Sequence, residues 1–388
     1  RDFCLSRGLG DVYKRQELKD PETGVYNTDP YNMIGSSPYG EMIVNNSDSY
    51  SYNLNANLTL LFKIMKGLTL SVQGGYDYDN SPSYSFRSKL DSPGAINSAS
   101  NTNALHNYWQ NTNNLTWQKQ FGDHSFTAMG VWEISRSWDS QLKGTGSNLN
   151  NESVGYWNLG NAAIRDASNS YTEFSLASGI VRANYDYKKR YFITAALRAD
   201  GSSKFQPENR WAFFGGVSGG WRISEEEFVK GLGVFDDLKL RLSYGTVGNQ
   251  GGIDRYDGVQ LYDFKQNGGA LVGSGLLSYV DTNGKLLSTD RTWEVIKNYN
   301  IGLDFGFLDN RLTGTAELFW KKCNNMLIDV TYPGTLGDKA PTANRGSFKA
   351  NGWEGTINWS DKIGEISYHL GGTFTYTTNK LVDNGGDA

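Results

Sequence analysis

The sequence predicts an all-β fold of long antiparallel strands in up-and-down order, and three observations support this prediction. The 388 residues include 46 glycines and 13 % aromatic residues but only 8 prolines, and few segments show helical periodicity. Apolar side chains recur at every second position over long segments, which indicates strands with one apolar face. Short turns tend to alternate with long polar connections, so all short turns of such a sheet would lie at one end.

The first alternation lies in SYSYNLNANLTLLFKIM, residues 49–65. Tyr50 and Tyr52 begin an apolar row that continues through leucines to Phe62, while the positions between carry mainly Asn, Ser and Thr. Thirteen residues at about 3.3 Å each span about 43 Å, whereas soluble strands usually have about five or six residues. Aromatic residues at both ends of an apolar band are typical of a strand that crosses a membrane in a β-barrel.

Further alternations predict strands, in chain order, at residues 68–78, 126–134, 179–187, 191–199, 211–221, 238–244, 299–307, 312–320, 353–359 and 366–376. Short turns are expected at residues 63–67, 120–124, 188–190, 308–311 and 360–364, and long loops at 79–104, 137–170, 248–294 and 323–346. The segment SEEEFVKG, residues 224–231, predicts a helix of one or two turns. Ser224 is its expected N-cap, Glu227 the capping-box residue and Gly231 the stop.

Two interpretations of the alternation compete. In a soluble sandwich the apolar face packs on a second sheet, whereas in a membrane barrel it meets lipid and the polar face lines a wet interior. The polar rows alone do not decide, because a solvated outer face would carry the same residues. Strand length, the rhythm of short and long connections and the aromatic residues at strand ends favour the transmembrane barrel.

The remaining composition excludes several classes of function. A net charge of −4 gives no basic surface for nucleic acid. Cys4 and Cys323 suggest neither a structural disulfide nor a zinc site, and the three histidines have no ligand spacing. No segment predicts a catalytic residue, a metal site or a cofactor. Residues 1–16, RDFCLSRGLGDVYKRQ, resemble translated sequencing-adapter sequence and are expected to be an artefact outside the fold.

Several segments together resemble one family. They are LRADGSSKFQPENRWAFFGGVSGGWRISEEEF (197–228), LKLRLSYGTVGNQ (238–250), TWEVIKNYNIGLDFGFLDNRLTGTAELFWKKCNNML (292–327), PGTLG (333–337) and NRGSFKANGWEGTINW (344–359). In this order they resemble the SusC/RagA-like TonB-dependent outer-membrane transporters of Bacteroidetes. The resemblance covers nearly everything after residue 45.

The resemblance implies a barrel of about 22 strands filled by an N-terminal plug, and no catalysis. It also implies a SusD-like surface lipoprotein as partner, and import of oligosaccharides or peptides driven by the TonB–ExbB–ExbD complex. Residues 17–388 are then expected to form a partial antiparallel transmembrane β-barrel of about 12–14 strands. Its short turns would be periplasmic, its long loops extracellular, and the plug and C-terminal strands absent. A soluble carbohydrate-binding or adhesion protein and a passive porin-like channel remain alternatives.

Two sets of residues are candidates for binding. Aromatic rings among amides and hydroxyls suit sugar rings, although interfacial packing is the alternative role. The candidates expected in long loops are Trp109, Trp138, Trp157, Tyr256 and Tyr262. The charges expected to face the plug from the polar rows are Arg182, Arg198, Arg241 and Glu317.

Overall fold

The structure is a computed structural model that describes residues 19–26, 38–265, 269–273, 275–281, 287, 290–329 and 342–384. The predicted artefact at 1–16 and the PGTLG segment lie outside these residues. The described contacts divide the chain into two compact units. The first unit comprises Arg1–Ala56, Gly75–Trp109 and Ser137–Glu173, and the second comprises Asn57–Gly74, Gln110–Arg136 and Phe174–Ala388.

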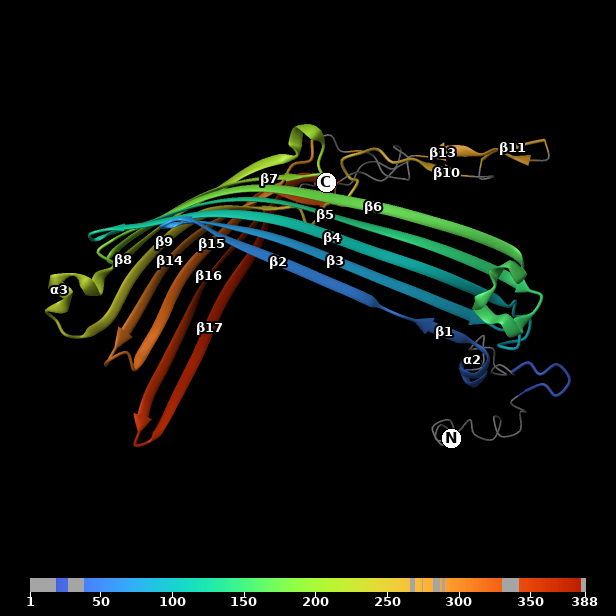
Figure 1. Ribbon diagram of the computed structural model, residues 1–388, viewed down its shortest axis with the longest axis horizontal. Helices are drawn as coiled ribbons and strands as arrows, with labels where there is room; N and C mark the ends of the chain where they lie inside the picture. Colours follow the sequence, from blue (N-terminus) through green and yellow to red (C-terminus); the bar gives the residue numbers. More distant parts are fainter. Residues whose placement is uncertain are drawn as a thin grey trace. The chain divides into compact units, whose positions relative to one another are not determined.

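The described chain is almost entirely β-structure (Figure 1). The long strands are β2 (Tyr52–Met65), β3 (Leu68–Arg87), β4 (Ser98–Phe121), β5 (His124–Leu149), β6 (Ala162–Tyr187), β7 (Tyr191–Ser202), β8 (Trp211–Arg222), β9 (Phe235–Asn249), β14 (Glu294–Phe307), β15 (Leu312–Asp329), β16 (Thr342–Ile363) and β17 (Ile366–Asp383). The short strands are β1 (Asn46–Ser49), β10 (Asp263–Lys265), β11 (Leu271–Val272), β12 (Gly275–Leu276) and β13 (Tyr279–Asp281). The helical segments are α2 (Pro38–Val44), α3 (Glu227–Lys230), η1 (Glu152–Trp157), η2 (Leu159–Asn161), η3 (Pro207–Asn209) and η4 (Ile223–Glu225).

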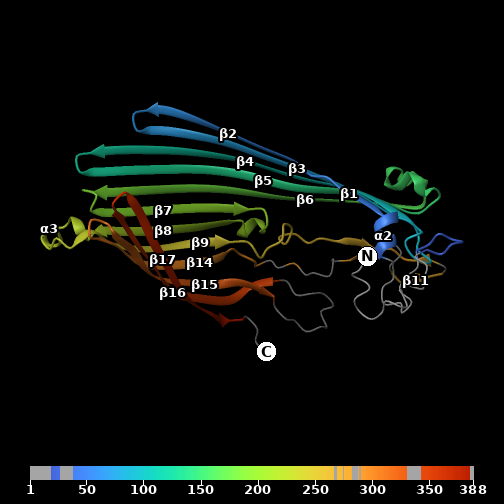
Figure 2. The ribbon, with the colours of Figure 1, turned by 90° about the horizontal axis from the view of Figure 1, so that it is seen from below.

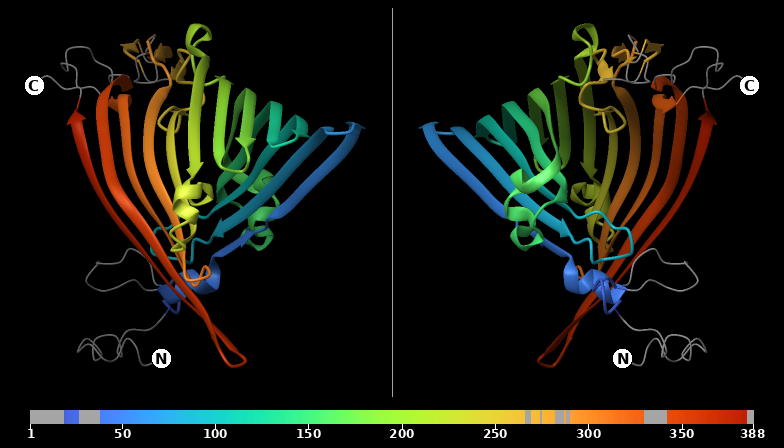
Figure 3. Two further views of the ribbon diagram at one scale, coloured as in Figure 1. Left: turned by 90° about the vertical axis from the view of Figure 1, so that its left-hand side faces the viewer. Right: turned by 90° about the vertical axis from the view of Figure 1, so that its right-hand side faces the viewer.

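One antiparallel sheet contains all the long strands in chain order, which confirms the predicted up-and-down topology. Figure 3 shows β14 to β17 following one another across the sheet. Within the described residues, β2 pairs only with β3 and β17 only with β16, so the sheet is open and fits a partial barrel. Both faces of β2 are exposed along its whole length. No helix in this part of the chain is long and apolar enough to cross a membrane.

A short turn is present at each of the five predicted connections, although residues 360–363 belong to β16 and the last turn lies at 364–365. The turns of β2–β3, β4–β5 and β6–β7 lie at the same strand ends as α3 (Figure 2). The β2–β3 turn requires glycine because Gly67 has φ +83 and its O accepts the backbone N–H of Gln118. A Cβ on Gly67 would lie 2.3 Å from the Gln118 carbonyl oxygen. The tight connection therefore depends on the absence of a side chain.

The helix predicted at 224–231 is present but begins two residues later than expected. Glu226 occupies the N-cap position of α3, and no side chain caps the helix. The hydroxyl of Ser224, the predicted cap, instead donates to Asp237 at 3.3 Å. Gly231 follows the helix as predicted, with a right-handed φ of −62.

Three of the predicted long loops are wrong in extent, and in the one at 323–346 residues 323–329 and 342–346 belong to β15 and β16. Residues 79–87 and 98–104 belong to β3 and β4, and residues 137–149 and 162–170 belong to β5 and β6. The sequence pattern also missed β4, where Asn, Gln and Thr occupy both faces. The apolar–polar alternation disappears from the sequence where a strand has polar residues on both faces, although its backbone hydrogen bonds to the neighbouring strands continue.

The register assembles one continuous apolar row in the second unit. Its successive cross-strand partners, from β7 to β17, are Ile193, Gly219, Leu242, Ile301, Leu318, Trp353 and Tyr376. The six non-glycine members are 42–56 % exposed. The apolar face of this sheet is therefore not covered by a second layer of the described protein.

The two clusters of buried apolar residues lie instead at the long-loop ends. In the first unit they are Ala99, Leu149, Tyr156 and Ala162. In the second unit they are Phe205, Phe214, Ile253 and Trp293, which we call the loop-base cluster.

Candidate functional site

On the polar face of the second unit, as on the apolar face, the strand register aligns side chains in rows across the sheet. Successive partners in one polar row are Phe192, Gly220, Arg241, Gly302, Glu317, Glu354 and Thr375. The next row contains Thr194, Ser218, Ser243, Asn300, Phe319, Gly352 and Thr377. Alternate residues point to opposite faces, so these rows share the side of the sheet away from Leu242 and Ile301.

Arg241 organises the charges of this face. Its Nε and Nη2 donate to both carboxylate oxygens of Asp304, with Nε–Oδ2 and Nη2–Oδ1 distances of 2.9 Å. Nη2 also lies 3.4 Å from Oε2 of Glu317, whose other oxygen accepts from the Asn300 amide. A Cβ on Gly302 would lie 2.8 Å from Nη2. The glycine therefore leaves the space in which the guanidinium lies across the sheet.

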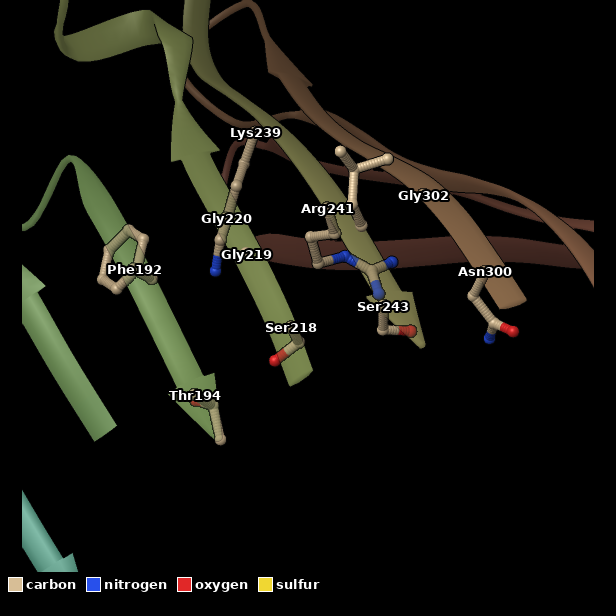
Figure 4. A pocket seen from close by; sticks show the side chains of 11 residues that line it. Phe192, Thr194, Ser218, Gly219, Gly220, Lys239, Arg241, Ser243, Asn300 and Gly302 are labelled. Atoms are coloured by element: carbon tan, nitrogen blue, oxygen red, sulfur yellow. The ribbon is translucent and has the colours of Figure 1, made fainter. Parts of the chain in front are cut away.

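A cavity of about 330 Å³ lies beside this network (Figure 4). Its polar lining includes Thr194, Ser218, Lys239, Arg241, Ser243 and Asn300, and Phe192 forms one side. The lining contains two cations and no Asp or Glu. The sequence prediction named Arg241 but missed Lys239 and Phe192.

The predicted charged residues all lie on the polar face, but Arg198, Arg241 and Glu317 are already in ion pairs within the sheet. Arg241 is held by Asp304, and Arg198 by Asp200, with a 2.6 Å contact between Nε and Oδ2. Buried Ser178 also donates to Asp200 at 2.5 Å. Arg182 donates to Asn184 at 3.1 Å. That these four side chains face a plug stays a prediction, which the internal pairs do not test.

The five predicted aromatic residues do not share one environment. Trp109 lies on β4 and Trp138 on β5, which corrects their predicted placement in loops. Their strands extend because both flanks remain paired in the sheet. Trp157 does lie in a connection, where it is 75 % exposed. Tyr256 and exposed Tyr262 lie in the second unit, between β9 and β10.

The faces of β4 and β5 can be assigned from their side-chain bonds. Thr112 donates to Glu133 at 2.9 Å, and His106 contacts Asp139 at 2.5 Å. These pairs place even residues of β4 and odd residues of β5 on one face. Trp109 and Trp138 therefore lie on the opposite face.

Trp157 belongs to an aromatic cluster of the first unit. Its ring lies 4.9 Å from the ring of Tyr156 and 5.8 Å from that of Tyr84, and Tyr84 stacks on Tyr156 at 5.4 Å. The Tyr156 hydroxyl donates to Asp48. This hydrogen bond, together with burial, raises the pKa of Tyr156 to about 12. One side of the cluster is thus fixed by a neutral phenol, while the Trp157 side chain is exposed.

The loop-base cluster brings together the sequence motifs that carry the family resemblance, although they are far apart in the sequence. Trp293 stacks on Phe205 at 5.0 Å and meets the edge of Phe214 at 5.8 Å. Its Nε1 donates to the carbonyl of Arg210 at 3.1 Å. The hydroxyl of Ser202 donates to Gln250 at 2.5 Å. The motifs at 197–228, 238–250 and 292–327 therefore build a structural base for the loops.

Backbone groups beside this cluster are satisfied by side chains. Asn344 accepts from the N–H of Thr292 at 2.8 Å and donates to the carbonyls of Thr292 and Asn325. Glu294 accepts from the N–H of Leu327 at 2.6 Å and from the amide of Asn249 at 2.5 Å. Buried Arg291 pairs with Asp257 at 2.6 Å. These bonds fix the start of β14 against its neighbours.

Among the residues that the structure describes, no group of three or more His, Cys, Asp or Glu could hold a metal ion. Cys323 is free and buried. The polar face carries ion pairs, hydroxyls and amides, which are groups that can bind a polar ligand through hydrogen bonds and charge.

Comparisons with known proteins agree with this architecture. Residues 6–388 match the family model described as TonB dependent receptor-like, beta-barrel. TonB-dependent receptor P26 of Formosa agariphila is 28 % identical over 385 residues, which cover 94 % of this chain and 38 % of that protein. TonB-dependent receptor SusC of Bacteroides thetaiotaomicron is 35 % identical over 233 residues, 58 % of this chain and 23 % of that protein.

A solved structure of the RagAB peptide transporter has the same fold. The superposition has a TM-score of 0.78 at 23 % identity and covers 89 % of this chain and 38 % of that chain. The chain thus spans about two fifths of the length of P26 and of the matched RagAB chain, and less of SusC.

Proposed function

The chain belongs to the TonB-dependent receptor-like β-barrel family, and we propose that it forms part of the wall of an outer-membrane importer. Proteins of this family are receptors and transporters rather than enzymes. In the longer protein, the apolar face meets lipid and the polar face lines the path of the solute. Import is by binding and translocation, without a chemical step.

The observation that carries the proposal is the contrast between the two faces of β7 to β17. The apolar row from Ile193 to Tyr376 is exposed across seven strands. In water, exposed apolar area costs roughly 25 cal/mol per Å², so a soluble sheet would cover this row with a second layer. The opposite face pairs Arg241 with Asp304 and Glu317, as an interior filled with water and polar groups requires.

The proposed solute is an oligosaccharide or a peptide. A relative named SusC and a structure named for peptide transport support an importer of large polar solutes. The proposed partners are a SusD-like surface lipoprotein, the TonB–ExbB–ExbD complex and outer-membrane lipid. Arg182, Arg198, Arg241 and Glu317 would face the plug, and Trp157 with Tyr256 and Tyr262 would meet solute at the loops.

Uptake measurements test this proposal. Cells that carry the complete gene should accumulate a labelled oligosaccharide or peptide, with the protein in the outer-membrane fraction. Deletion of TonB should abolish that uptake. Unchanged uptake without TonB would instead support a passive porin-like channel, and recovery of the protein in the aqueous fraction would support the soluble alternative.

A further inference from the structure

Three cations lie close together on the polar face near the short turns, but only two of them have carboxylate partners. Arg222 lies 3.4 Å from Asp237, measured from Nε to Oδ1. Arg241 occupies both oxygens of Asp304. Lys239 lies between them in the register, opposite Arg222 on β8 and Asp304 on β14. Its neighbouring carboxylates are thus already engaged by arginines.

Among the described residues, no carboxylate lies within ion-pair distance of the Lys239 ammonium. The side chain is nevertheless held in place, because Nζ lies 4.5 Å from the centre of the Phe192 ring. A Cβ on Gly220 would lie 3.2 Å from Cε of Lys239 and 3.4 Å from Cβ of Phe192. Glycine therefore leaves the groove in which the lysine stem lies. The aromatic face attracts the ammonium from one side only, so its other hydrogens remain available.

The cavity of about 330 Å³ around this ammonium has the chemistry of a site for one negative charge (Figure 4). Asp304 and Glu317 both contact Arg241, and neither forms an ion pair with Lys239. Lys239 is the cation left to pair with an incoming group. Thr194, Ser218 and Asn300 supply further hydrogen-bonding groups. A singly charged carboxylate with neighbouring hydroxyls or amides matches this set better than a phosphate, which carries more charge.

We propose that the Lys239 cavity binds a carboxylate group. The carboxylate comes either from an imported solute, as in a uronic acid or a peptide C-terminus, or from a side chain of the plug in the longer protein. The Lys239 ammonium forms the ion pair, and the hydroxyls of Thr194 and Ser218 hold the neighbouring polar groups. The identity of these two sources rests on the proposed function, whereas the carboxylate chemistry rests on the cavity itself.

Calorimetric titration of the purified chain in detergent micelles tests the proposal with matched ligand pairs. The first pair is glucuronate and glucose, and the second is N-acetyl-alanine and its amide. At least one carboxylate should bind at least tenfold more tightly than its uncharged partner. Lys239→Met should abolish that difference, and Lys239→Arg should retain it within a few-fold.

Lys321→Met is the matched control. Lys321 also lies over a phenylalanine, with Nζ 5.5 Å from the centre of the Phe319 ring, but it does not line the cavity. Its removal should leave both affinities unchanged. The difference in gel migration between unheated and heated protein, compared between variants, shows whether each variant has folded alike.

The complete protein distinguishes the two sources. If it binds the free carboxylate as the chain does, the source is the solute; if only the shorter chain binds, a segment of the protein occupies the site. The proposal is wrong if no carboxylate binds the chain, if uncharged partners bind equally well, or if Lys239→Met leaves the preference intact. TonB-dependent uptake is a separate measurement, so its failure would refute the proposed function without touching the carboxylate site.

Discussion

The loop-base cluster and the apolar row are neighbours along the same part of the chain but follow opposite rules of packing. Phe205, Phe214 and Trp293 in the cluster are 2–6 % exposed. Leu242, Ile301 and Leu318 in the row are 42–50 % exposed. Strand β8 contributes Phe214 to the cluster and Gly219 to the row, while Ile253 follows β9 and Trp293 directly precedes β14. One strand therefore passes from a region that makes its own core to a region that leaves its apolar side open.

The difference lies in what surrounds each region. The loop ends meet water, so they bury aromatic rings against one another and satisfy backbone groups with Asn325 and Asn344. Within the described residues no second layer of protein covers the row, and lipid is the environment in which its exposure costs nothing. Internal packing should therefore decide stability at the cluster, whereas the match to lipid should decide it along the row.

Trp293→Ala should produce the largest loss of stability. It removes a ring that stacks on Phe205 and leaves a cavity, so the free energy of unfolding should fall by about 3–5 kcal/mol. Trp320→Ala is the matched control, since Trp320 is 43 % exposed on β15. The loss in free energy of unfolding caused by Trp320→Ala should be less than half that caused by Trp293→Ala. Urea unfolding in phospholipid vesicles measures both, and equal losses would remove the distinction between the two regions.

A charge on the apolar face should give the next largest effect. Ile357 is 46 % exposed on β16, and its neighbour Thr356 lies on the opposite face. Ile357→Arg should lower the free energy of unfolding in vesicles by up to about 2–4 kcal/mol, because the charge enters lipid. Thr356→Arg should change it by less than about 1 kcal/mol, since the polar face is wet. If Thr356→Arg proved the more harmful of the two, the assignment of the faces would be reversed.

The two faces were predictable because alternation in residues 49–65 and 191–199 reports directly which side of a strand is apolar. The full length of β4 was not, because Asn107 and His106 point to opposite faces and both are polar. The sequence marks residues 197–228 and 292–327 as motifs, but their convergence on Trp293 depends on the register of β8, β9 and β14. The unpaired charge of Lys239 could not be predicted from the sequence for the same reason, since it depends on which acidic residues pair with Arg222 and Arg241.

Loss of one polar link in the loop base should have a smaller effect than loss of a ring. Asn344→Ala removes bonds to both backbone groups of Thr292 and to the carbonyl of Asn325. The free energy of unfolding should fall by about 1–3 kcal/mol, because partly buried backbone groups lose their partners. Asn358→Ala on the same strand β16 should change it by no more than about 0.5 kcal/mol. Urea unfolding measures both, and similar losses would show that the amide bonds do not hold the loop base.

The smallest expected effect extends the comparison to the loop end of the first unit and depends on pH. Burial of Glu152 alone would raise its pKa, but bonds from the Lys89 N–H, the Ser88 hydroxyl and the Asn97 amide outweigh burial and lower the pKa below 4.5. A carboxyl with a lowered pKa in the folded state contributes stability above its unfolded pKa and loses it as the pH falls through the folded value.

The melting temperature of the wild type should therefore exceed that of Glu152→Gln at neutral pH. The difference should shrink below pH 4.5, the ordinary value for a glutamate, as the carboxylate gains a proton and becomes equivalent to the neutral amide. Glu208→Gln, at an exposed position in η3, controls for the loss of one surface charge. A difference that persists unchanged down to pH 3 would mean that shape rather than charge makes Glu152 hold Ser88 and Asn97. In that case the loop end of the first unit would owe its order to packing alone, as Trp293 does in the second.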